Sequence, residues 1–236
     1  MELETGTTDL LARVVDRVAV FTLNRPERRN AFSPEMLGAL ARLLEHVEGD
    51  DGVGAILLTG SGGAFCAGGD VKGFAAGTAT PAGTLPASFD RGVASQRLNQ
   101  RATAGKLYSI PKPTLAALPG ATAGAGLALA LACDMRIAAR GAVLTTAFAK
   151  VGFSGDYGGT WFLSRLVGLG KAKELYYLSE RIEADEAERL GIVNWMVEPE
   201  DLEKASMELA VRLANGPSVA YRYMKENLNR AVDGPL

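Results

Sequence analysis

The sequence predicts an α/β fold in which most strands are parallel. Apolar runs of strand length alternate with segments whose apolar residues recur at helical spacing. Glycine clusters precede or follow several of these runs, as expected where a strand leads into a helix. Strands separated by helices of this length require crossover connections, which favour parallel pairing.

The first elements are expected to be a hairpin and a helix. The runs 11–15 and 18–23 are rich in β-branched residues and are separated by two polar residues, which predicts two antiparallel strands. Ser33 followed by Pro34 is typical of a helix start, and Gly49 is expected to end that helix. Between them, the apolar residues with helical spacing are Met36, Leu37, Leu40, Leu44 and Val47.

The rest of the chain continues the alternation. Apolar strands are predicted at 55–59, 114–118, 135–139 and 142–145, and the stretch 75–87 is expected to be a mobile surface loop. Helical patterns cover 126–132, 160–167, 171–178, 185–190, 202–213 and 219–229. We therefore expect a core domain over 1–196 and a helical C-terminal region over 197–236.

Composition excludes several classes of function. The chain has 236 residues, 47% of them apolar, and a net charge of −2, which argues against a general nucleic-acid binder. A single histidine, His46, excludes His-rich zinc sites, and the cysteines Cys66 and Cys133 are too few for a Cys-rich metal site. No transmembrane or secretory pattern is present, so the expectation is a soluble cytoplasmic protein that binds neither membrane nor nucleic acid.

Two glycine-rich segments, 64–70 and 120–126, are candidates for a site built from backbone amides. A strand that ends in glycine before a helix leaves N–H groups unpaired and directed at one place. One donor from each segment would form an oxyanion hole for a polarised carbonyl. Taken singly, each segment is more simply a tight turn. Neither is a phosphate-binding P-loop, and a dinucleotide site is weakly supported.

Taken together, the motifs resemble the crotonase (enoyl-CoA hydratase/isomerase) superfamily. The matching segments occur in order from about Leu11 to Val232, and the local match is closest to ring 1,2-epoxyphenylacetyl-CoA isomerases and enoyl-CoA isomerases. They are 24–31 (NRPERRNA), 64–72 (AFCAGGDVK), 110–114 (IPKPT), 120–126 (GATAGAG), 132–138 (ACDMRIA), 158–160 (GGT) and 187–194 (AERLGIVN).

The resemblance implies a ββα spiral core followed by a helical C-terminal trimerisation region. It also implies a coenzyme A thioester as substrate, no further cofactor or metal, and a homotrimer or hexamer. Relatives usually continue past the helix at 219–229 with two further helices. The expectation is therefore that the sequence given is incomplete at this end or that a lid over the pocket is missing.

Matching positions assign roles within the site. The oxyanion donors would be the amides of Gly69 and Ala125, where many relatives have glycine at the second position; alanine is tolerated there if its φ is negative. Arg28 and Lys72 match positions near the phosphates and adenine of coenzyme A, although each could equally be a solvated surface cation. The remaining residues assigned to substrate binding are Ala67, Asp70, Phe148, Tyr157 and Trp161.

The acid/base residues depart from the hydratase pattern. Hydratases of the superfamily carry glutamates at the positions that match Ala128 and Phe148. Because hydration normally uses two positioned carboxylates, a two-glutamate mechanism is disfavoured. Asp156 matches the catalytic aspartate of dienoyl-CoA and ring epoxide isomerases, whereas its simpler interpretation is a helix cap. Burial beside aromatic residues is expected to raise its pKa, as a base that returns its proton requires.

The resulting hypothesis is a one-base isomerase, in which Asp156 moves a proton along the acyl chain while Gly69 and Ala125 stabilise the enolate. Three alternatives stay open. Asp156 could activate water as a hydratase, or the chain could run another crotonase-type reaction such as thioester hydrolysis or dehalogenation. It could also bind acyl-CoA without catalysis, because both glutamates are absent.

Overall fold

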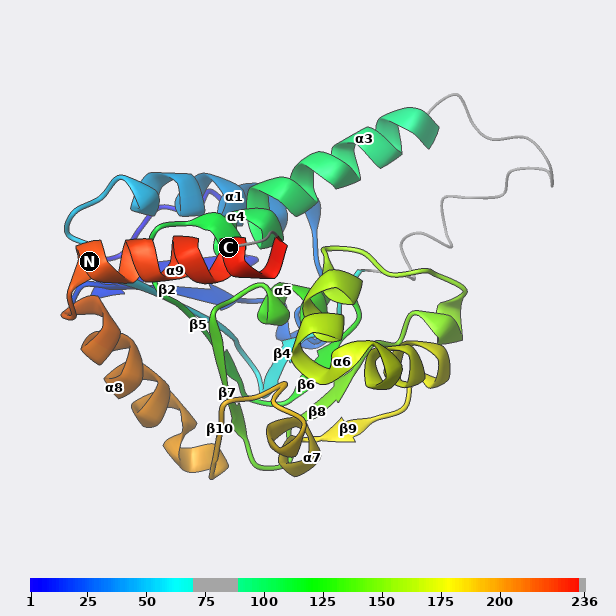
Figure 1. Ribbon diagram of the computed structural model, residues 1–236. Helices are drawn as coiled ribbons and strands as arrows, with labels where there is room; N and C mark the ends of the chain where they lie inside the picture. Colours follow the sequence, from blue (N-terminus) through cyan, green and yellow to red (C-terminus); the bar gives the residue numbers. More distant parts are fainter. Residues whose placement is uncertain (70–88, 234–236) are drawn as a thin grey trace.

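The computed structural model describes residues 1–69 and 89–233, which form two sheets surrounded by helices (Figure 1). The larger sheet has six strands in the order β1-β2-β3-β5-β7-β10, and the smaller one has four in the order β4-β6-β8-β9. The strands of the larger sheet are β1 (Leu10–Val15), β2 (Val18–Leu23), β3 (Ala55–Gly60), β5 (Thr114–Leu118), β7 (Met135–Ala139) and β10 (Trp195–Val197). Those of the smaller sheet are β4 (Ala64–Cys66), β6 (Ala121–Ala123), β8 (Val143–Thr145) and β9 (Ile182–Glu183).

The predicted mixture of one hairpin and parallel strands is confirmed. β1 and β2 are antiparallel and joined through Asp16 and Arg17, which both have positive φ (49° and 66°). From β2 onward the larger sheet is parallel, with Val18 opposite Ala55 and Leu57 opposite Leu115. The smaller sheet is parallel across β4, β6 and β8 and antiparallel only at β8–β9.

The helices begin and end close to the predicted positions. Ser33 caps α1 (Pro34–Glu48) by accepting a hydrogen bond from the Met36 amide at 3.1 Å, and the predicted apolar residues of this helix are all buried. The two patterns at 160–167 and 171–178 form two helical segments that share the label α6 (Gly159–Leu178) and are separated at Gly168, whose backbone is non-helical (φ 77°, ψ 158°). The remaining helices on the predicted patterns are α5 (Ala125–Leu131), α7 (Ala184–Arg189), α8 (Leu202–Ala214) and α9 (Ser218–Asp233).

Several parts of the structure were not predicted. The stretch after residue 88 is helical, as α3 (Phe89–Gln100), a π-helical turn (Arg101–Gly105) and α4 (Lys106–Ser109). β4 and β6 lie within the segments expected to be glycine-rich turns, and β9 and β10 were not predicted either. These four strands are only two or three residues long, so their hydrophobic periodicity is too short to detect. The predicted loop at 75–87 lies outside the described residues.

The strands of the larger sheet are apolar on both faces because both faces are covered. Ile56 and Leu58 of β3 face the main core, which also contains α1 and α5, whereas Ala55 and Leu57 face α8. Figure 1 shows α8 along one side of this sheet and α5 between the two sheets. The first turn of α5 therefore starts in the interior, beside the edge of the smaller sheet.

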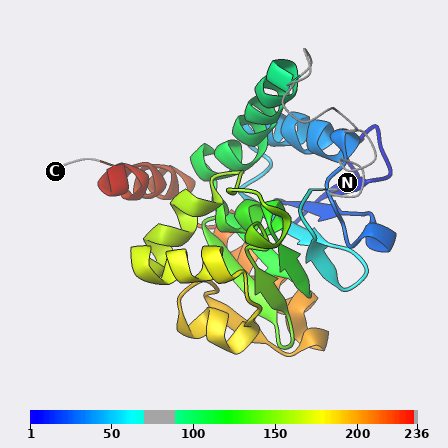
Figure 2. The ribbon, with the colours of Figure 1, turned by 90° about the vertical axis from the view of Figure 1, so that its right-hand side faces the viewer.

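Two helices extend away from the body. In the view of Figure 2, α3 projects upward from the end near α1, and α9 projects to the left. The Lys225 ammonium of α9 holds this helix to the body through the Leu107 and Lys112 carbonyls (3.0 and 3.2 Å) and the Asp134 carboxylate (3.0 Å). No helix within the described residues is long and apolar enough to cross a membrane.

Candidate active site

The two glycine-rich segments converge at the start of α5. β4 and β6 pair in parallel, with Ala64 opposite Ala121, so the residues that follow the two strands emerge side by side. A Cβ atom built on Gly68 would lie 2.8 Å from the Ala123 carbonyl oxygen and 3.1 Å from the Ala125 nitrogen. The backbone at Gly68, with φ +87°, thus approaches the first turn of α5 more closely than any side chain would permit.

The two predicted donor amides lie on these adjoining backbones. Ala125 is the first residue of α5, so its N–H has no acceptor within the helix. The preceding Gly124, with φ 53° and ψ −124°, donates its own amide to the Thr145 carbonyl at 3.0 Å. Gly69 is bridged to Phe32, whose amide donates to the Gly68 carbonyl at 2.8 Å. Alanine at 125 is accommodated because its backbone is helical, with negative φ.

A fully buried asparagine, Asn30, holds the turn that leads into β4. Its amide nitrogen donates to the Ser61 and Ala64 carbonyls at 2.9 and 2.8 Å, and its oxygen accepts from the Arg25 amide at 2.8 Å. The Asn30 backbone has φ +57°, a region that asparagine tolerates better than most residues. The sequence analysis placed this residue within the motif at 24–31 without giving it a role.

Asp156 lies on a loop with unusual backbone geometry just before α6. Gly155, Tyr157 and Gly158 all have positive φ, at 108°, 49° and 76°. The Asp156 carbonyl accepts from the Gly159 amide at 3.0 Å, which closes the turn. Positive φ in a buried tyrosine is a strained conformation of the kind that gathers at functional sites.

The Asp156 carboxyl group is half-buried and incompletely paired. Its Oδ2 accepts from the Gln96 side-chain nitrogen of α3 at 3.3 Å, and its buried Oδ1 has no hydrogen-bond partner among the described residues. Burial raises the pKa of this carboxyl to about 6, and the bond from Gln96 opposes that rise only partly. The sequence-based expectation of a raised pKa is thus confirmed. A group with this pKa exchanges protons readily near neutral pH.

Asp156 and the donor amides belong to one continuous set of contacts. The Tyr157 ring lies 5.3 Å from the ring of Phe32, which is bonded to the Gly68 carbonyl. On the other side of the loop, a Cβ on Gly159 would lie 3.0 Å from the Ala128 Cβ of α5. The loop that carries Asp156 therefore packs against both segments that carry the donors.

Aromatic side chains line this region, as the sequence suggested. Phe148 is buried and its ring stacks on Tyr176, with centroids 5.9 Å apart and planes within 3°. Trp161 is half-buried in α6, and the guanidinium of Arg165 lies 3.8 Å from its ring centroid. Tyr176 was not among the predicted site residues, because its place in an amphipathic helical pattern gave no reason to separate it from core residues.

The other predicted site residues have simpler environments. Arg28 is exposed on the 3-10 helix Pro26–Arg28, and Ala67 is half-buried with its amide bonded to the Arg29 carbonyl at 2.9 Å. Asp70 and Lys72 lie outside the described residues. These positions leave the assignment to coenzyme A binding as a prediction.

The cysteines and the histidine of the chain lie apart from acid/base or metal-binding arrangements among the described residues. Cys66 and Cys133 are buried, and burial raises the pKa of each thiol to about 12, so neither forms a thiolate at neutral pH. His46 is exposed on α1. No cluster of three or more potential metal ligands occurs among residues 1–69 and 89–233. Asp134 is structural: its Oδ2 accepts from Thr114 and Lys225.

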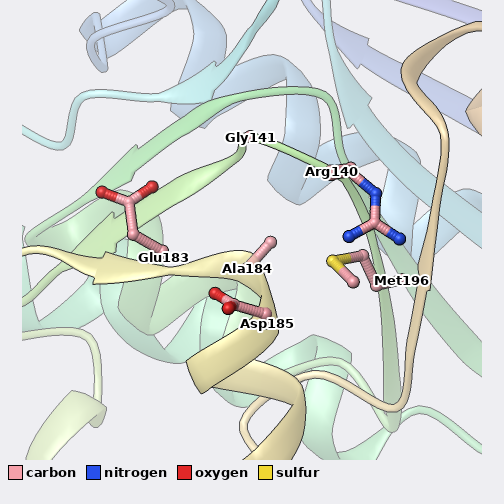
Figure 3. A pocket seen from close by; sticks show the side chains of 6 residues that line it. All are labelled: Arg140, Gly141, Glu183, Ala184, Asp185 and Met196. Carbon is pink, nitrogen blue, oxygen red and sulfur yellow. The ribbon is translucent and has the colours of Figure 1, made fainter.

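A separate pocket of about 210 Å³ opens near β9 and α7 (Figure 3). It is lined by Arg140, Gly141, Glu183, Ala184, Asp185 and Met196, and shares no residue with the candidate site. Arg140 is already paired with the Glu198 carboxylate at 2.6 Å. The carboxylates of Glu183 and Asp185 in this small pocket would repel an anionic thioester, so the pocket is better suited to solvent.

Comparison with known proteins gives consistent matches over almost the whole chain. The profile of a family described as enoyl-CoA hydratase/isomerase matches residues 14–236. The 1,2-epoxyphenylacetyl-CoA isomerase of Escherichia coli is 38% identical over 227 residues, which cover 96% of this chain and 84% of that protein. The short-chain-enoyl-CoA hydratase of Clostridium acetobutylicum is 34% identical over 217 residues, which cover 92% of this chain and 79% of that protein.

Solved structures agree with the fold. The crystal structure of an enoyl-CoA hydratase from Bacillus anthracis superposes with a TM-score of 0.86 at 31% identity, covering 96% of this chain and 84% of that one. The expected crotonase fold is thereby confirmed.

Proposed function

This chain belongs to the enoyl-CoA hydratase/isomerase family, and we propose that within it the protein moves a double bond along the acyl chain of an enoyl-CoA thioester. The observation that carries the proposal is Asp156: a half-buried carboxyl group with a raised pKa and an unpartnered buried oxygen among the described residues. Such a group can both take and return a proton.

In the proposed reaction, the thioester carbonyl oxygen accepts hydrogen bonds from the Gly69 and Ala125 amides. Removal of a proton from the acyl chain moves negative charge onto that oxygen, so the two donors stabilise the enolate as it forms. Each donor of this kind is typically worth about 10²–10³ in rate. The close approach of Gly68 to Ala125 supports a shared position for the oxygen.

Asp156 performs both proton transfers. Its carboxylate removes a proton from one carbon of the acyl chain and becomes a neutral acid, and the electron pair delocalises into an extended enolate. The acid then gives the proton to another carbon of the same chain. The double bond has moved, the composition of the substrate is unchanged, and Asp156 is again a carboxylate.

The residues at positions 128 and 148 support isomerisation over hydration. The two sites that match the glutamates of hydratases hold an alanine and a phenylalanine, both buried in apolar surroundings. Among the described residues, Asp156 is the carboxyl group on the loop that packs against both donor segments. Without a second carboxylate among the described residues of this site, water would lack a group to activate it while Asp156 delivers a proton.

Hydration is the second candidate, because several relatives carry that name, including the Clostridium acetobutylicum protein. It would require Asp156 to activate the water that adds to the double bond. Thioester hydrolysis, dehalogenation and acyl-CoA binding without turnover are further outcomes that the experiment below separates.

The substrate and assembly follow from the same proposal. Arg28, an exposed cation, would contact the phosphate groups of coenzyme A. Assembly into a homotrimer or hexamer would cover apolar residues of α9 that are exposed in the single chain. They are Val219, Tyr223, Met224, Leu228 and Val232, each between 47% and 69% exposed.

The test is to incubate the protein separately with a 3-enoyl-CoA and its 2-enoyl isomer in heavy water and to follow both by mass spectrometry. We expect the isomers to interconvert without a mass gain of one water. A mass gain of one water would establish hydration instead, and release of free coenzyme A would establish hydrolysis. Binding of the esters without any of these changes would leave acyl-CoA binding as the function.

A further inference from the structure

The hydroxyl of Tyr176 is a polar group of the candidate site that the reaction above does not use. It projects from α6 toward the loop that carries Asp156: a Cβ on Gly159 would lie 2.6 Å from this oxygen, and a Cβ on Gly155 would lie 3.7 Å from it. The Cβ built on Gly159 would also lie 3.0 Å from the Ala128 Cβ. The hydroxyl thus lies between the Asp156 loop and the first turns of α5.

The tyrosine ring is held in place by an apolar neighbour. It stacks on Phe148 with the two planes within 3° of parallel. Phe148 and Ala128 are the two positions that match the glutamates of hydratases, so Tyr176 lies where both replaced side chains meet. Its hydroxyl is a polar atom beside these two apolar side chains.

The hydroxyl makes no hydrogen bond to any described residue. Burial raises the pKa of this phenol well above its usual range, and the neighbouring Asp156 carboxylate raises it further. The group is therefore a neutral donor at every physiological pH. The Tyr176 side chain is half-buried, and an acyl group bound beside it would exclude water from the hydroxyl. A bound molecule that supplies an acceptor to this hydroxyl therefore gains relative to one that does not.

We propose that Tyr176 donates a hydrogen bond to an oxygen atom of the bound acyl group, and so favours oxygenated acyl chains over plain hydrocarbon ones. The inference rests on the proposed function, because it assumes that the acyl group lies beside Asp156. A site built to hydrogen-bond a substrate oxygen discriminates strongly against the analogue that lacks it. Tyr176 is thus a specificity-determining residue, and Asp156 remains the acid/base.

The test uses saturated thioesters, which have no double bond to move. Hexanoyl-CoA is compared with 3-oxahexanoyl-CoA and 5-oxahexanoyl-CoA, in which an ether oxygen replaces carbon 3 or carbon 5. Binding of each ester to the wild type, to Tyr176→Phe and to Tyr177→Phe is measured by calorimetry. Tyr177, on the same helix and 72% exposed, is the matched control.

The quantity compared is the affinity for an oxa-ester divided by the affinity for hexanoyl-CoA. For at least one oxa-ester, we expect Tyr176→Phe to lower this ratio about fivefold to tenfold, the size of one neutral hydrogen bond. Tyr177→Phe should leave the ratio unchanged. An equal ratio in wild type and Tyr176→Phe for both oxa-esters would overturn the inference. So would an equal loss of affinity for all three esters, which would indicate that the ring only packs.

The outcome is separable from that of the isomerase test. If Tyr176→Phe lowers the affinity for an oxa-ester relative to hexanoyl-CoA but the protein does not move double bonds, the specificity role of Tyr176 stands and the proposed reaction is wrong. If the protein isomerises enoyl-CoA and Tyr176→Phe leaves that relative affinity unchanged, the reaction stands and the role of Tyr176 is wrong. Equal melting temperatures of wild type and Tyr176→Phe would establish that removal of the hydroxyl leaves the fold intact.

Discussion

The two sides of the candidate site are built from different parts of the chain. On one side, the Gly69 and Ala125 segments contribute backbone amides, positioned by β4, β6 and the first turn of α5. On the other side, the loop at 155–158 and helix α6 contribute the side chains of Asp156, Tyr157 and Tyr176. A backbone donor has the same chemistry whatever residue carries it, whereas each side chain can be exchanged alone.

This difference explains how related chains can share one fold and run different reactions. In the proposed mechanism, the donor side polarises the thioester carbonyl, and its geometry is part of the sheet. The side-chain half decides what happens to the resulting enolate. In this chain that half holds one carboxyl group and several aromatic rings within the described residues, where the hydratase pattern has two glutamates.

The strongest test of the side-chain half is Asp156→Asn. We expect turnover of an enoyl-CoA to fall about 10³-fold, because the amide can neither accept nor return the proton. Acyl-CoA affinity should change little, since the donors and the pocket walls are untouched. Steady-state rates and calorimetry on the same preparation check both statements. A variant that keeps more than about a tenth of the wild-type rate would remove Asp156 from the mechanism.

The donor half is tested by Gly68→Ala against Gly63→Ala. Both glycines have positive φ (87° and 75°), but a Cβ at Gly68 meets the Ala123 carbonyl at 2.8 Å, whereas one at Gly63 meets nothing within 4 Å. Both variants should lose about 1–2 kcal/mol of stability from backbone strain. We expect Gly68→Ala alone to lose an additional tenfold to 100-fold in turnover, because it displaces the donors.

Urea denaturation of the two variants measures the stability lost to backbone strain. Rate measurements on the same variants show whether the donor amides of the oxyanion hole have been displaced. Equal turnover in both would mean that the spacing between Gly68 and α5 is unimportant for the reaction.

Asp156 should also reduce the stability of the folded protein at neutral pH. Its pKa in the folded state is raised to about 6, so the folded state favours the protonated form, and stability from this group is lost as the pH rises through that value. Asp156→Asn should therefore be more stable than wild type at pH 8, by on the order of 1 kcal/mol after discounting for partial exposure.

Near pH 4 that difference should disappear, because the carboxyl is then neutral in the folded protein. Thermal denaturation of both proteins at the two pH values provides the measurement. A variant less stable than wild type at pH 8 would assign Asp156 a structural role, such as capping α6.

The smallest expected effect concerns Gln96, which donates to Asp156 from α3. The wild-type kcat/KM should decline as the pH falls below about 6, where the base becomes protonated. Gln96→Ala removes a bond that favours the carboxylate, so the acid limb should move to higher pH, with little change in the plateau. Ser95→Ala, an exposed change on the same helix, is the control. Superimposable profiles for all three proteins would show that Gln96 does not influence the base.

The sequence predicted the fold more completely than the site. Strands 114–118 and 135–139 and the cap at Ser33 were located to the residue, because apolar runs and capping chemistry are local signals. β4 and β6 were missed as strands, since three residues carry too little periodicity. The candidate acid/base and donors came from motif similarity, and their catalytic roles stay predictions.

By itself, the sequence determined the α/β alternation, the family, and the presence of Asp156 in place of the hydratase glutamates. Only the tertiary structure decided what surrounds Asp156. The bond from Gln96 reaches Asp156 across 60 positions of the sequence, and the Tyr176 hydroxyl lies between the Asp156 loop and α5. The Asp156 Oδ1 is buried there without a partner among the described residues. Burial and the resulting pKa depend on such long-range packing, which no local pattern encodes.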